Sequence, residues 1–289
     1  MESCEPRPDG SLAPRWTGPA AALPQACHPG PVVAVTALAT ALAVAAGQSG
    51  QRCAWASGAV LAGQLSVGWC NDAFDARRDT GAGRRGKPVA AGRVSVPVVW
   101  GAAITALLLC VPLSLAYGPL AGAVHLTGVA AGWTYNLRLK ATTFSWLPYA
   151  VGFASLPAFV ALGLPGRPWP AWWALVAGAL LGVGAHLADA LPDIPRDLEA
   201  GVRGLPQRLG PRLTRLTLPL PLLAATAVLA LGPGGAPDAA GLTALALAAA
   251  TALTGAGLGR RREGAPFAAA VLVAAVDVAL LLVRGSTFV

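Results

Sequence analysis

Apolar stretches close to the length needed to cross a bilayer recur along this chain from residue 30 to residue 284. A bilayer-crossing helix takes roughly 20 apolar residues, and inside lipid only helices and closed barrels satisfy every backbone hydrogen bond. Charged residues make up 12% of the chain, about half the share usual in soluble domains. We therefore predict an all-α integral membrane protein with nine transmembrane helices, at 30–48, 53–71, 95–116, 118–136, 144–164, 169–188, 214–232, 239–258 and 265–284.

The basic residues test this count and its orientation, because short cytoplasmic loops collect Lys and Arg. With the N-terminus inside, 18 of the 21 basic residues fall in the predicted cytoplasmic segments, and only Arg52, Arg167 and Arg284 fall on the other side. This asymmetry supports nine spans, a cytoplasmic N-terminus and a C-terminus on the opposite side. The net charge of +8 is then a topology signal that also attracts anionic membrane lipid, and nucleic acid is not an expected partner.

Residues 1–29 differ from the rest of the chain, because they are rich in Pro and Gly and carry Glu2, Glu5 and Asp9. A signal peptide has a basic start and an apolar stretch, so we expect instead a flexible cytoplasmic tail, followed by a membrane domain over 30–289. The five cysteines form no CxxC pair, so disulfides and cysteine-bound metal are not expected. The heavy use of Pro, Gly, Ala and Arg is typical of a GC-rich bacterial genome and predicts a place in the bacterial inner (plasma) membrane.

Acidic side chains concentrate at the ends of the second and sixth predicted spans, where 72–79 and 189–199 hold seven of the 13 Asp and Glu residues. An aspartate at mid-bilayer costs about 2.5–3.5 kcal/mol on insertion scales, so this concentration indicates function. The pattern Asp-x3-Asp-x5-Arg-Gly-x-Pro begins at Asp75 and again at Asp193, a constant offset of 118 residues. We interpret it as an internal repeat, with motifs at 71–93 and 189–210 on the same side of the membrane.

Helical spacing places the carboxylates of each cluster on one stripe. At about 100° per residue, Asp72, Asp75 and Asp79 share one face, and positions 189, 193 and 197 advance by about 40° per step. Two facing acidic stripes suit Mg²⁺, a hard cation that takes oxygen ligands and is commonly shared with substrate phosphates. The arginines and the lysine that follow suit the phosphate oxygens. The alternative is that each cluster is a solvated face or a set of salt-bridge partners for the nearby arginines.

Five ordered stretches resemble motifs of the UbiA-type intramembrane prenyltransferases. NDAFDARRD (71–79) resembles the family's NDxxDxxxD motif, and DALPDIPRD (189–197) resembles its second aspartate motif. The stretches GKPVAAGRVS (86–95), YNLRLK (135–140) and GVRGLPQRLG (201–210) are similar to the family's basic loop, its Tyr…Lys signature and its Gly-x-x-x-Leu-Pro segment.

The resemblance extends over residues 30–284 and implies a nine-helix bundle around a central cavity, with cytoplasmic cap loops. It also implies that an isoprenyl diphosphate binds through Mg²⁺, with two ions expected. The chain departs from the family at Asp189, where many members have Asn, at Lys87, where Arg is frequent, and at Arg203, where Thr or Lys is more usual. These departures bear on phosphate contacts and on the choice of substrate.

Residue by residue, the resemblance implies a catalytic role for Asp72, Asp75, Asp79, Asp193 and Asp197, and Asn71 and Asp189 complete the expected metal ligands. The diphosphate is expected to meet the basic side chains of Arg84, Arg85, Lys87, Lys140 and Arg203. An electron-rich chamber for a carbocation is expected from aromatic side chains near the cytoplasmic helix ends, namely Trp69, Trp133, Tyr135, Phe144, Trp146, Tyr149 and Phe153. The alternative for each aromatic is an interfacial or packing role.

These assignments predict an enzyme that ionises an isoprenyl diphosphate, transfers the prenyl group to an aromatic or quinone-precursor acceptor, and releases diphosphate. Some members of the same superfamily instead cyclise their diphosphate to a terpene, and no acceptor-binding motif separates the two readings here. A transporter is the third reading, but transporter sites are expected near the bilayer midplane, whereas these clusters lie at one face. The roles of His186 and Asp277, in the sixth and ninth predicted spans, stay open, as do the donor chain length and the oligomeric state.

Overall fold

The computed structural model describes residues 19–84, 86–259 and 264–287, and every regular element within them is a helix. A helix satisfies its backbone hydrogen bonds within one segment, which favours this solution for so apolar a chain. The long helices are α2 (Pro29–Ala45), α3 (Gly50–Gly81), α4 (Val96–Tyr117), α5 (Pro119–Leu137), α6 (Leu147–Leu162), α7 (Trp172–Ala190), α10 (Pro219–Leu231), α11 (Ala239–Leu258) and α12 (Ala265–Val283). The shorter ones are α1 (Pro19–Ala26), η1 (Leu139–Ala141), η2 (Leu191–Asp193), α8 (Ile194–Glu199) and α9 (Leu205–Thr217).

Each of the nine predicted spans coincides largely with one long helix of the described chain. Four helical segments of these residues are long and apolar enough to cross a membrane, namely α4, the path Trp172–Glu199, α11 and α12. The pair α9–α10, bent by 49°, is a fifth candidate, while α2 and α6 are apolar but shorter. These segments indicate an integral membrane protein, and the number of nine crossings stays a prediction.

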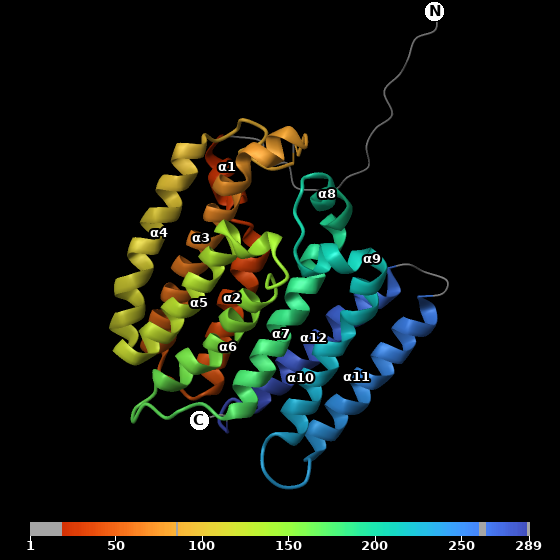
Figure 1. The fold of residues 1–289 in the computed structure, drawn as a ribbon. Helices are drawn as coiled ribbons and strands as arrows, with labels where there is room; N and C mark the ends of the chain where they lie inside the picture. The colour runs from red at the N-terminus through yellow and green to blue at the C-terminus, as the bar shows by residue number, and fades with distance from the viewer. Residues whose placement is uncertain (1–18, 85, 260–263, 288–289) are drawn as a thin grey trace, which may run out of the picture.

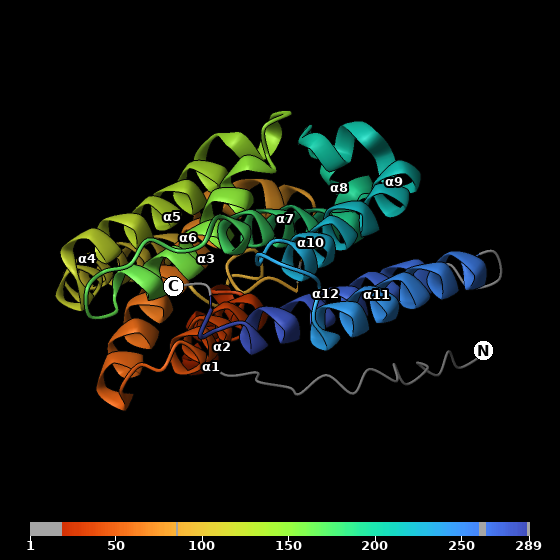
Figure 2. The same cartoon turned by 90° about the horizontal axis from the view of Figure 1, so that it is seen from below.

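The helices pack side by side in a bundle that largely follows sequence order, as Figures 1 and 2 show. α2 packs against α3, α3 against α4 and α5, α5 against α6, and α6 against α7. α7 then contacts α10, α10 contacts α11 and α12, and α12 returns to α2. The last helix thereby closes the bundle against the first long one.

Small residues bring neighbouring helices close together, as is common where lipid supplies no hydrophobic drive between helices. At Gly122, α5 lies against the backbone of Ser114 in α4, and at Gly182, α7 lies against the backbone of Tyr149 in α6. A Cβ at either glycine would collide with backbone atoms of the neighbouring helix. The largest buried cluster includes Phe159 and joins α2, α3, α6, α7, α10 and α12.

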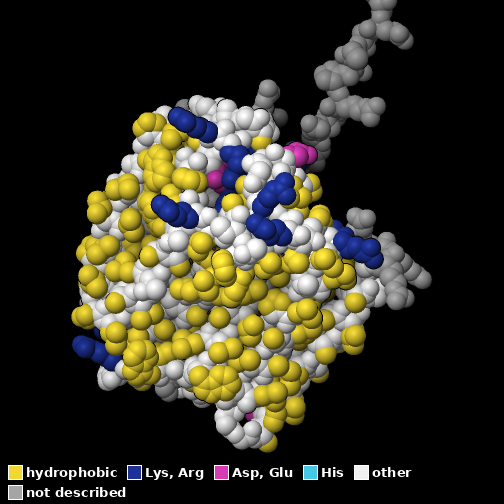
Figure 3. All heavy atoms as spheres, in the orientation of Figure 1, with side chains coloured by type: hydrophobic (Ala, Val, Ile, Leu, Met, Phe, Trp, Pro, Cys, Tyr) yellow, Lys and Arg dark blue, Asp and Glu magenta, His cyan; other side chains and the backbone are white. Residues whose placement is uncertain are grey.

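Polar contacts distinguish the two ends of the bundle. At one end Arg52 donates hydrogen bonds to the backbone oxygens of Tyr117 and Gly163, where α4 and α6 end. The other end carries α1, α8, α9 and the loop after α3 (Figure 1). In Figure 3, Lys and Arg side chains gather at this second end, above a mostly hydrophobic flank. It is the end that the sequence predicts to be cytoplasmic.

Residues 19–26, which the sequence assigns to a flexible tail, form helix α1 instead. The indole N–H of Trp69 in α3 donates to the backbone oxygen of Leu23 at 2.8 Å, and apolar packing around Trp69 buries one side of α1. This contact between segments far apart in the chain orders a stretch that has no strong local signal. Residues 1–18 of the predicted tail lie outside the described residues.

Candidate active site

The first aspartate set lies on α3, which continues to Gly81, past the predicted end of its span at residue 71. Asp72, Asp75 and Asp79 are 1%, 3% and 1% exposed. They share the buried face of this helix, as their spacing predicts. Three buried carboxylates on one face require positive partners, because an unpaired buried charge is costly.

Two lysines from other segments supply such partners. The Lys87 Nζ lies 3.3 Å from Asp72 Oδ1 and 2.8 Å from Asp79 Oδ2. The Lys140 Nζ lies 2.6 Å from Asp75 Oδ2. Lys87 belongs to the loop after α3, within the stretch 86–95, and Lys140 belongs to η1 after α5, within the stretch 135–140. Two stretches that resemble family motifs therefore meet the first aspartate motif.

The second aspartate set lies on a helical path that changes its winding where α7 passes through the 3₁₀ turn η2 into α8. Pro192 has no N–H to continue the α-helical ladder, and a 3₁₀ turn advances about 120° per residue instead of about 100°. The predicted regular stripe of three aspartates is therefore wrong. Asp197 is buried, Asp193 is half-buried and Asp189 is exposed. The two copies of the sequence repeat thus differ in local structure.

Arg84 joins the two aspartate sets. Its Nε lies 3.6 Å from Asp79 Oδ1 and its Nη1 lies 3.7 Å from Asp193 Oδ2. Its Nη2 donates to Asp197 Oδ1 at 3.2 Å. The other oxygen of Asp197 accepts a hydrogen bond from Gln207 Nε2 of α9 at 2.9 Å. Carboxylates from α3 and from the α7–α8 path therefore face each other across one guanidinium group.

Two of the predicted metal ligands have other partners. Asp189 Oδ2 accepts a hydrogen bond from the Tyr149 hydroxyl at 2.9 Å, and none of the ion pairs in the described residues includes it. Asn71 donates its side-chain amide to Asn136 Oδ1 at 3.0 Å, and Asn136 donates to the backbone oxygen of Val67 at 2.9 Å. Asn71 is therefore bonded to α5, and Asp189 is bonded to α6. Neither residue belongs to the group of five aspartates that form ion pairs with Lys87, Lys140 and Arg84.

One predicted diphosphate ligand, Arg203, stands apart from this group, and another lies outside the described residues. Arg203 is exposed on the turn before α9 and forms no ion pair with an acidic residue of the described segments. Arg85 lies outside the described residues. Of the predicted diphosphate ligands that the structure describes, Arg84, Lys87 and Lys140 therefore lie at the aspartates.

The predicted aromatic chamber is assembled only in part. Tyr135, Tyr149 and His186 form a compact group, with ring centroids 4.9 to 5.8 Å apart. The other predicted aromatics lie elsewhere: Trp69 bonds to α1, Trp133 donates to Ser66 Oγ at 3.2 Å, Phe144 is exposed, Trp146 is half-buried before α6, and Phe153 lines a separate cavity. Packing between helices decides which of the aromatic side chains meet, and the sequence alone does not show this packing.

The two residues with open roles both make contacts between helices. His186 Nε2 lies 3.0 Å from Ser145 Oγ, which also accepts the backbone N–H of Leu205 at 2.9 Å. These contacts join α7, the start of α6 and α9. Asp277 is fully buried in α12, and its Oδ1 accepts a hydrogen bond from Thr226 of α10 at 2.5 Å. Among the described residues, no Lys or Arg forms an ion pair with Asp277.

The oxygens of the aspartate sets suit a divalent cation in their chemistry. The carboxylate oxygens of Asp72 and Asp79 are buried without a hydrogen-bond donor, although ion pairs with Lys87 and Arg84 reach them. Across the described segments, no three acidic, His or Cys side chains converge into a ready-made metal site, because basic side chains lie between the aspartates. Oxygen ligands without donors match the chemistry of Mg²⁺. The aspartates would fit such an ion if a lysine or arginine between them moved to another partner.

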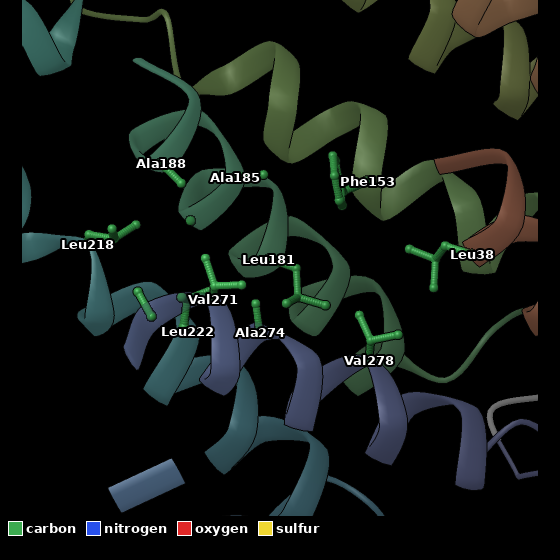
Figure 4. A pocket seen from close by; sticks show the side chains of 12 residues that line it. Leu38, Phe153, Leu181, Ala185, Ala188, Leu218, Leu222, Val271, Ala274 and Val278 are labelled. Carbon is green, nitrogen blue, oxygen red and sulfur yellow. The ribbon is translucent and has the colours of Figure 1, made fainter. Parts of the chain in front are cut away.

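An apolar cavity of about 180 Å³ lies beside α7, with Ala188 near the end of that helix in its wall (Figure 4). Ala188 in its wall directly precedes Asp189 in α7, so the cavity leads from the acidic end toward the apolar middle of the bundle. Its wall comes from α2, α6, α7, the start of α10 and α12, through Leu38, Phe153, Leu181, Gly184, Ala185, Ala188, Leu218, Leu222, Ala270, Val271, Ala274 and Val278.

Three polar residues at the site were not predicted from the sequence. Asn136 and Gln207 lie inside the stretches YNLRLK and GVRGLPQRLG, so the motifs themselves contained a signal for them. His28 had no such signal, and its Nε2 lies 3.9 Å from Asp72 Oδ1. Burial, together with the charge of Lys87, lowers the pKa of His28, so the ring is neutral at pH 7.

Solved structures with the same fold include several UbiA homologs. One from Archaeoglobus fulgidus, bound to GPP and Mg²⁺, is 18% identical with a TM-score of 0.66, over 91% of this chain and 99% of that chain. An apo homolog from Aeropyrum pernix K1 is 19% identical with a TM-score of 0.66, over 86% and 97%. A digeranylgeranylglyceryl phosphate synthase is 13% identical with a TM-score of 0.68, over 93% and 99%. At these identities the likeness shows the fold alone.

No match was found among curated proteins. The family model for UbiA prenyltransferases, in contrast, matches residues 32–280, which is most of the chain. This range contains both aspartate sets, the lysines that pair with them and all the long helices except the first residues of α2 and the last of α12. The chain belongs to the UbiA prenyltransferase family.

Proposed function

We propose that this protein is a Mg²⁺-dependent prenyltransferase that ionises an isoprenyl diphosphate and transfers the prenyl group to an aromatic or quinone-precursor acceptor. The observation that carries this proposal is the pair of aspartate sets joined by Arg84 beside an apolar cavity. A diphosphate needs charged partners and a prenyl chain needs an apolar space, and Ala188 in the cavity wall directly precedes Asp189 of the second aspartate set. Family membership supports prenyl-diphosphate chemistry, and related structures are described with GPP, DMAPP and Mg²⁺.

Asp72, Asp75 and Asp79 from α3, with Asp193 and Asp197 from the α7–α8 path, are the residues that would hold Mg²⁺, with two ions expected. Carboxylate oxygens are the ligands this cation prefers, and those of Asp72 and Asp79 are buried with ion pairs to Lys87 and Arg84 as their contacts. When bound, Mg²⁺ would neutralise the charge that builds on the departing diphosphate.

Arg84, Lys87 and Lys140 would bind the diphosphate oxygens. Each now pairs with an aspartate, which keeps it desolvated and in place before the substrate enters. The planar guanidinium of Arg84 suits two-point contact with phosphate, and it already spans both aspartate sets. A diphosphate that enters between the sets therefore meets cations whose positions are already determined.

Tyr135 and Tyr149 would face the carbocation that remains when the allylic C–O bond breaks. Cation–π contact with an aromatic face stabilises a cation by about 2 kcal/mol when both are desolvated. The hydrogen bond from Tyr149 to Asp189 places a carboxylate next to this ring group and adds favourable charge. The prenyl chain would extend into the apolar cavity that begins at Ala188.

The apolar helices and the family indicate an integral membrane protein. We further propose that the N-terminus and the site face the cytoplasm, and that the C-terminus lies on the opposite side of a bacterial inner membrane. The asymmetric distribution of basic residues and their gathering at the end of the molecule that carries the site support this orientation.

The reaction is tested with purified protein in vesicles of phosphatidylcholine mixed with phosphatidylglycerol, using isoprenyl diphosphates of several lengths, Mg²⁺, and an aromatic acceptor added or omitted. We expect diphosphate release that needs both Mg²⁺ and the acceptor, with a prenylated acceptor as the product. A hydrocarbon or terpene alcohol formed without an acceptor would identify a terpene cyclase instead and overturn the transfer reaction.

The site is tested with Asp72→Ala and Asp193→Ala. Each is expected to abolish diphosphate release while the protein still inserts into membranes, because each removes an oxygen ligand from one aspartate set. Asp238→Ala is the control, since this residue pairs with Arg284 at the opposite end of the bundle. Release at the wild-type rate by both site variants would overturn the site assignment.

A further inference from the structure

The basic residues around the site divide into two groups. One group forms ion pairs with aspartates and consists of Arg78, Arg84, Lys87, Lys140 and Arg196. The other group forms no ion pair with an acidic residue of the described segments, and four of its members occupy α9 and the turn before it, namely Arg203, Arg208, Arg212 and Arg215. α9 itself contains no acidic residue. Its positive charge is therefore uncompensated within the described protein.

Large apolar side chains lie beside these arginines. Leu213 is 51% exposed, Leu216 is 63% exposed, and Leu220 at the start of α10 is 60% exposed. Arg212 is exposed and Arg215 is half-buried within the same segment. Arginines next to exposed leucines are typical of helices that lie in the membrane interface, where the leucines enter the acyl region and the arginines meet the headgroups.

The shape of this segment agrees with such a position. α9 bends by 49° from α10, and its backbone changes direction at Gly210, which has a φ of 77°. The inward face of α9 is buried against the aspartate group, where Gln207 donates to Asp197 and the Leu205 N–H donates to Ser145. The part of α9 before Gly210 therefore contacts the site, while the part after Gly210 carries Arg212 and Arg215 beside the exposed leucines.

We propose that α9 docks on anionic lipid headgroups, with Arg212 and Arg215 binding lipid phosphate. Charge complementarity identifies the occupant, because the arginines have no acidic partner in the described protein and a zwitterionic headgroup offers no net negative charge to balance them. Docking holds α9 against the bundle. If the proposed function is correct, it also keeps Gln207 in contact with Asp197 and makes diphosphate release depend on anionic lipid.

The docking surface is tested by native mass spectrometry of protein released from vesicles of phosphatidylcholine mixed with phosphatidylglycerol. The variant with Arg212→Gln and Arg215→Gln is expected to retain phosphatidylglycerol about thirtyfold more weakly than the wild type, at about fivefold per arginine. The variant with Arg212→Lys and Arg215→Lys keeps the charge and is expected to retain the lipid. Arg167→Gln removes an exposed arginine far from α9 in sequence and predicted to face the other side, and is the control.

If the glutamine variant melts at the same temperature as the wild type, it is correctly folded. Equal retention by the wild type and the glutamine variant would overturn the docking surface, and so would an equal loss in Arg167→Gln. Weaker retention with unchanged diphosphate release in the same vesicles would keep the docking surface and overturn its link to Asp197. Because lipid retention is measured without substrate, the test of the docking surface does not depend on whether the proposed reaction is correct.

Discussion

Replacing Gly204 with alanine tests whether the contact of α9 with η1 and α6 sets the distance between the two aspartate sets. A Cβ at Gly204 would lie 2.5 Å from the backbone oxygen of Lys140, 2.8 Å from Gln207 Oε1 and 3.0 Å from Ser145 Oγ. The Lys140 carbonyl belongs to the backbone, so it cannot rotate away as the end of a flexible side chain can. The φ of Gly204 is −67°, so the effect of alanine is steric and involves no backbone strain.

The expected loss of stability follows from these contacts. Overpacking costs about 1–3 kcal/mol, and the shift would also weaken the hydrogen bond from Leu205 to Ser145, worth about 0.5–1.5 kcal/mol. We expect a loss of about 2–4 kcal/mol, which lowers the melting temperature of a chain of this size by about 4–8 °C. The same shift displaces Lys140 and Gln207, the partners of the aspartates, and a displacement of about 1 Å can cost about a hundredfold in rate.

Thermal unfolding in detergent and Mg²⁺-dependent diphosphate release in vesicles measure the two effects separately. Gly101→Ala in α4 is the matched control, because a Cβ at Gly101 meets open space. We expect this control to leave release unchanged and to raise stability by up to about 1 kcal/mol, since alanine favours a helix more than glycine. If Gly204→Ala melted and turned over like Gly101→Ala, the close contact would not position the aspartates and the reasoning would be refuted.

Three further changes probe other contacts. Lys87→Met leaves two buried carboxylates without their lysine, which costs about 3–5 kcal/mol, so Mg²⁺ is expected to raise the melting temperature of this variant more than that of the wild type, and an equal shift would contradict the metal site. Arg52→Ala removes a donor to two helix ends and is expected to lower stability by about 2–3 kcal/mol in thermal unfolding, whereas Arg167→Ala should lie within about 0.5 kcal/mol of the wild type. The hydrogen bond from the Gly241 N–H and the charge of Arg284 lower the pKa of Asp238, so its contribution to stability is present above the unfolded pKa of about 3.9 and is lost as pH falls through the lower folded pKa. Melting curves of Asp238→Asn should lack this acid-sensitive part, and an unchanged pH profile would exclude the pair as its source.

The class of protein and the positions of its helices were predictable because lipid leaves a chain few solutions. An apolar stretch of about 20 residues in a bilayer must bond its own backbone groups, so each of the nine predicted ranges contains a helix. The two acidic clusters likewise lie toward helix ends, because a charge at mid-bilayer is costly. Helical periodicity alone correctly placed Asp72, Asp75 and Asp79 on one buried face, because α3 is continuous through all three.

The partners of these aspartates depended on the tertiary structure. Arg84 reaches Asp197 across 113 residues of sequence, and Lys140 reaches Asp75 across 65. Local periodicity describes neither contact. It also gave the wrong arrangement for the second aspartate set, because a 3₁₀ turn alters the winding of the helix and Asp189 accepts a hydrogen bond from Tyr149. The sequence by itself determined which residues lie at this end of the bundle, because hydropathy acts segment by segment. Only the packing of helices decided which of them touch, because ion pairs and hydrogen bonds need side chains from distant segments within a few ångströms of each other.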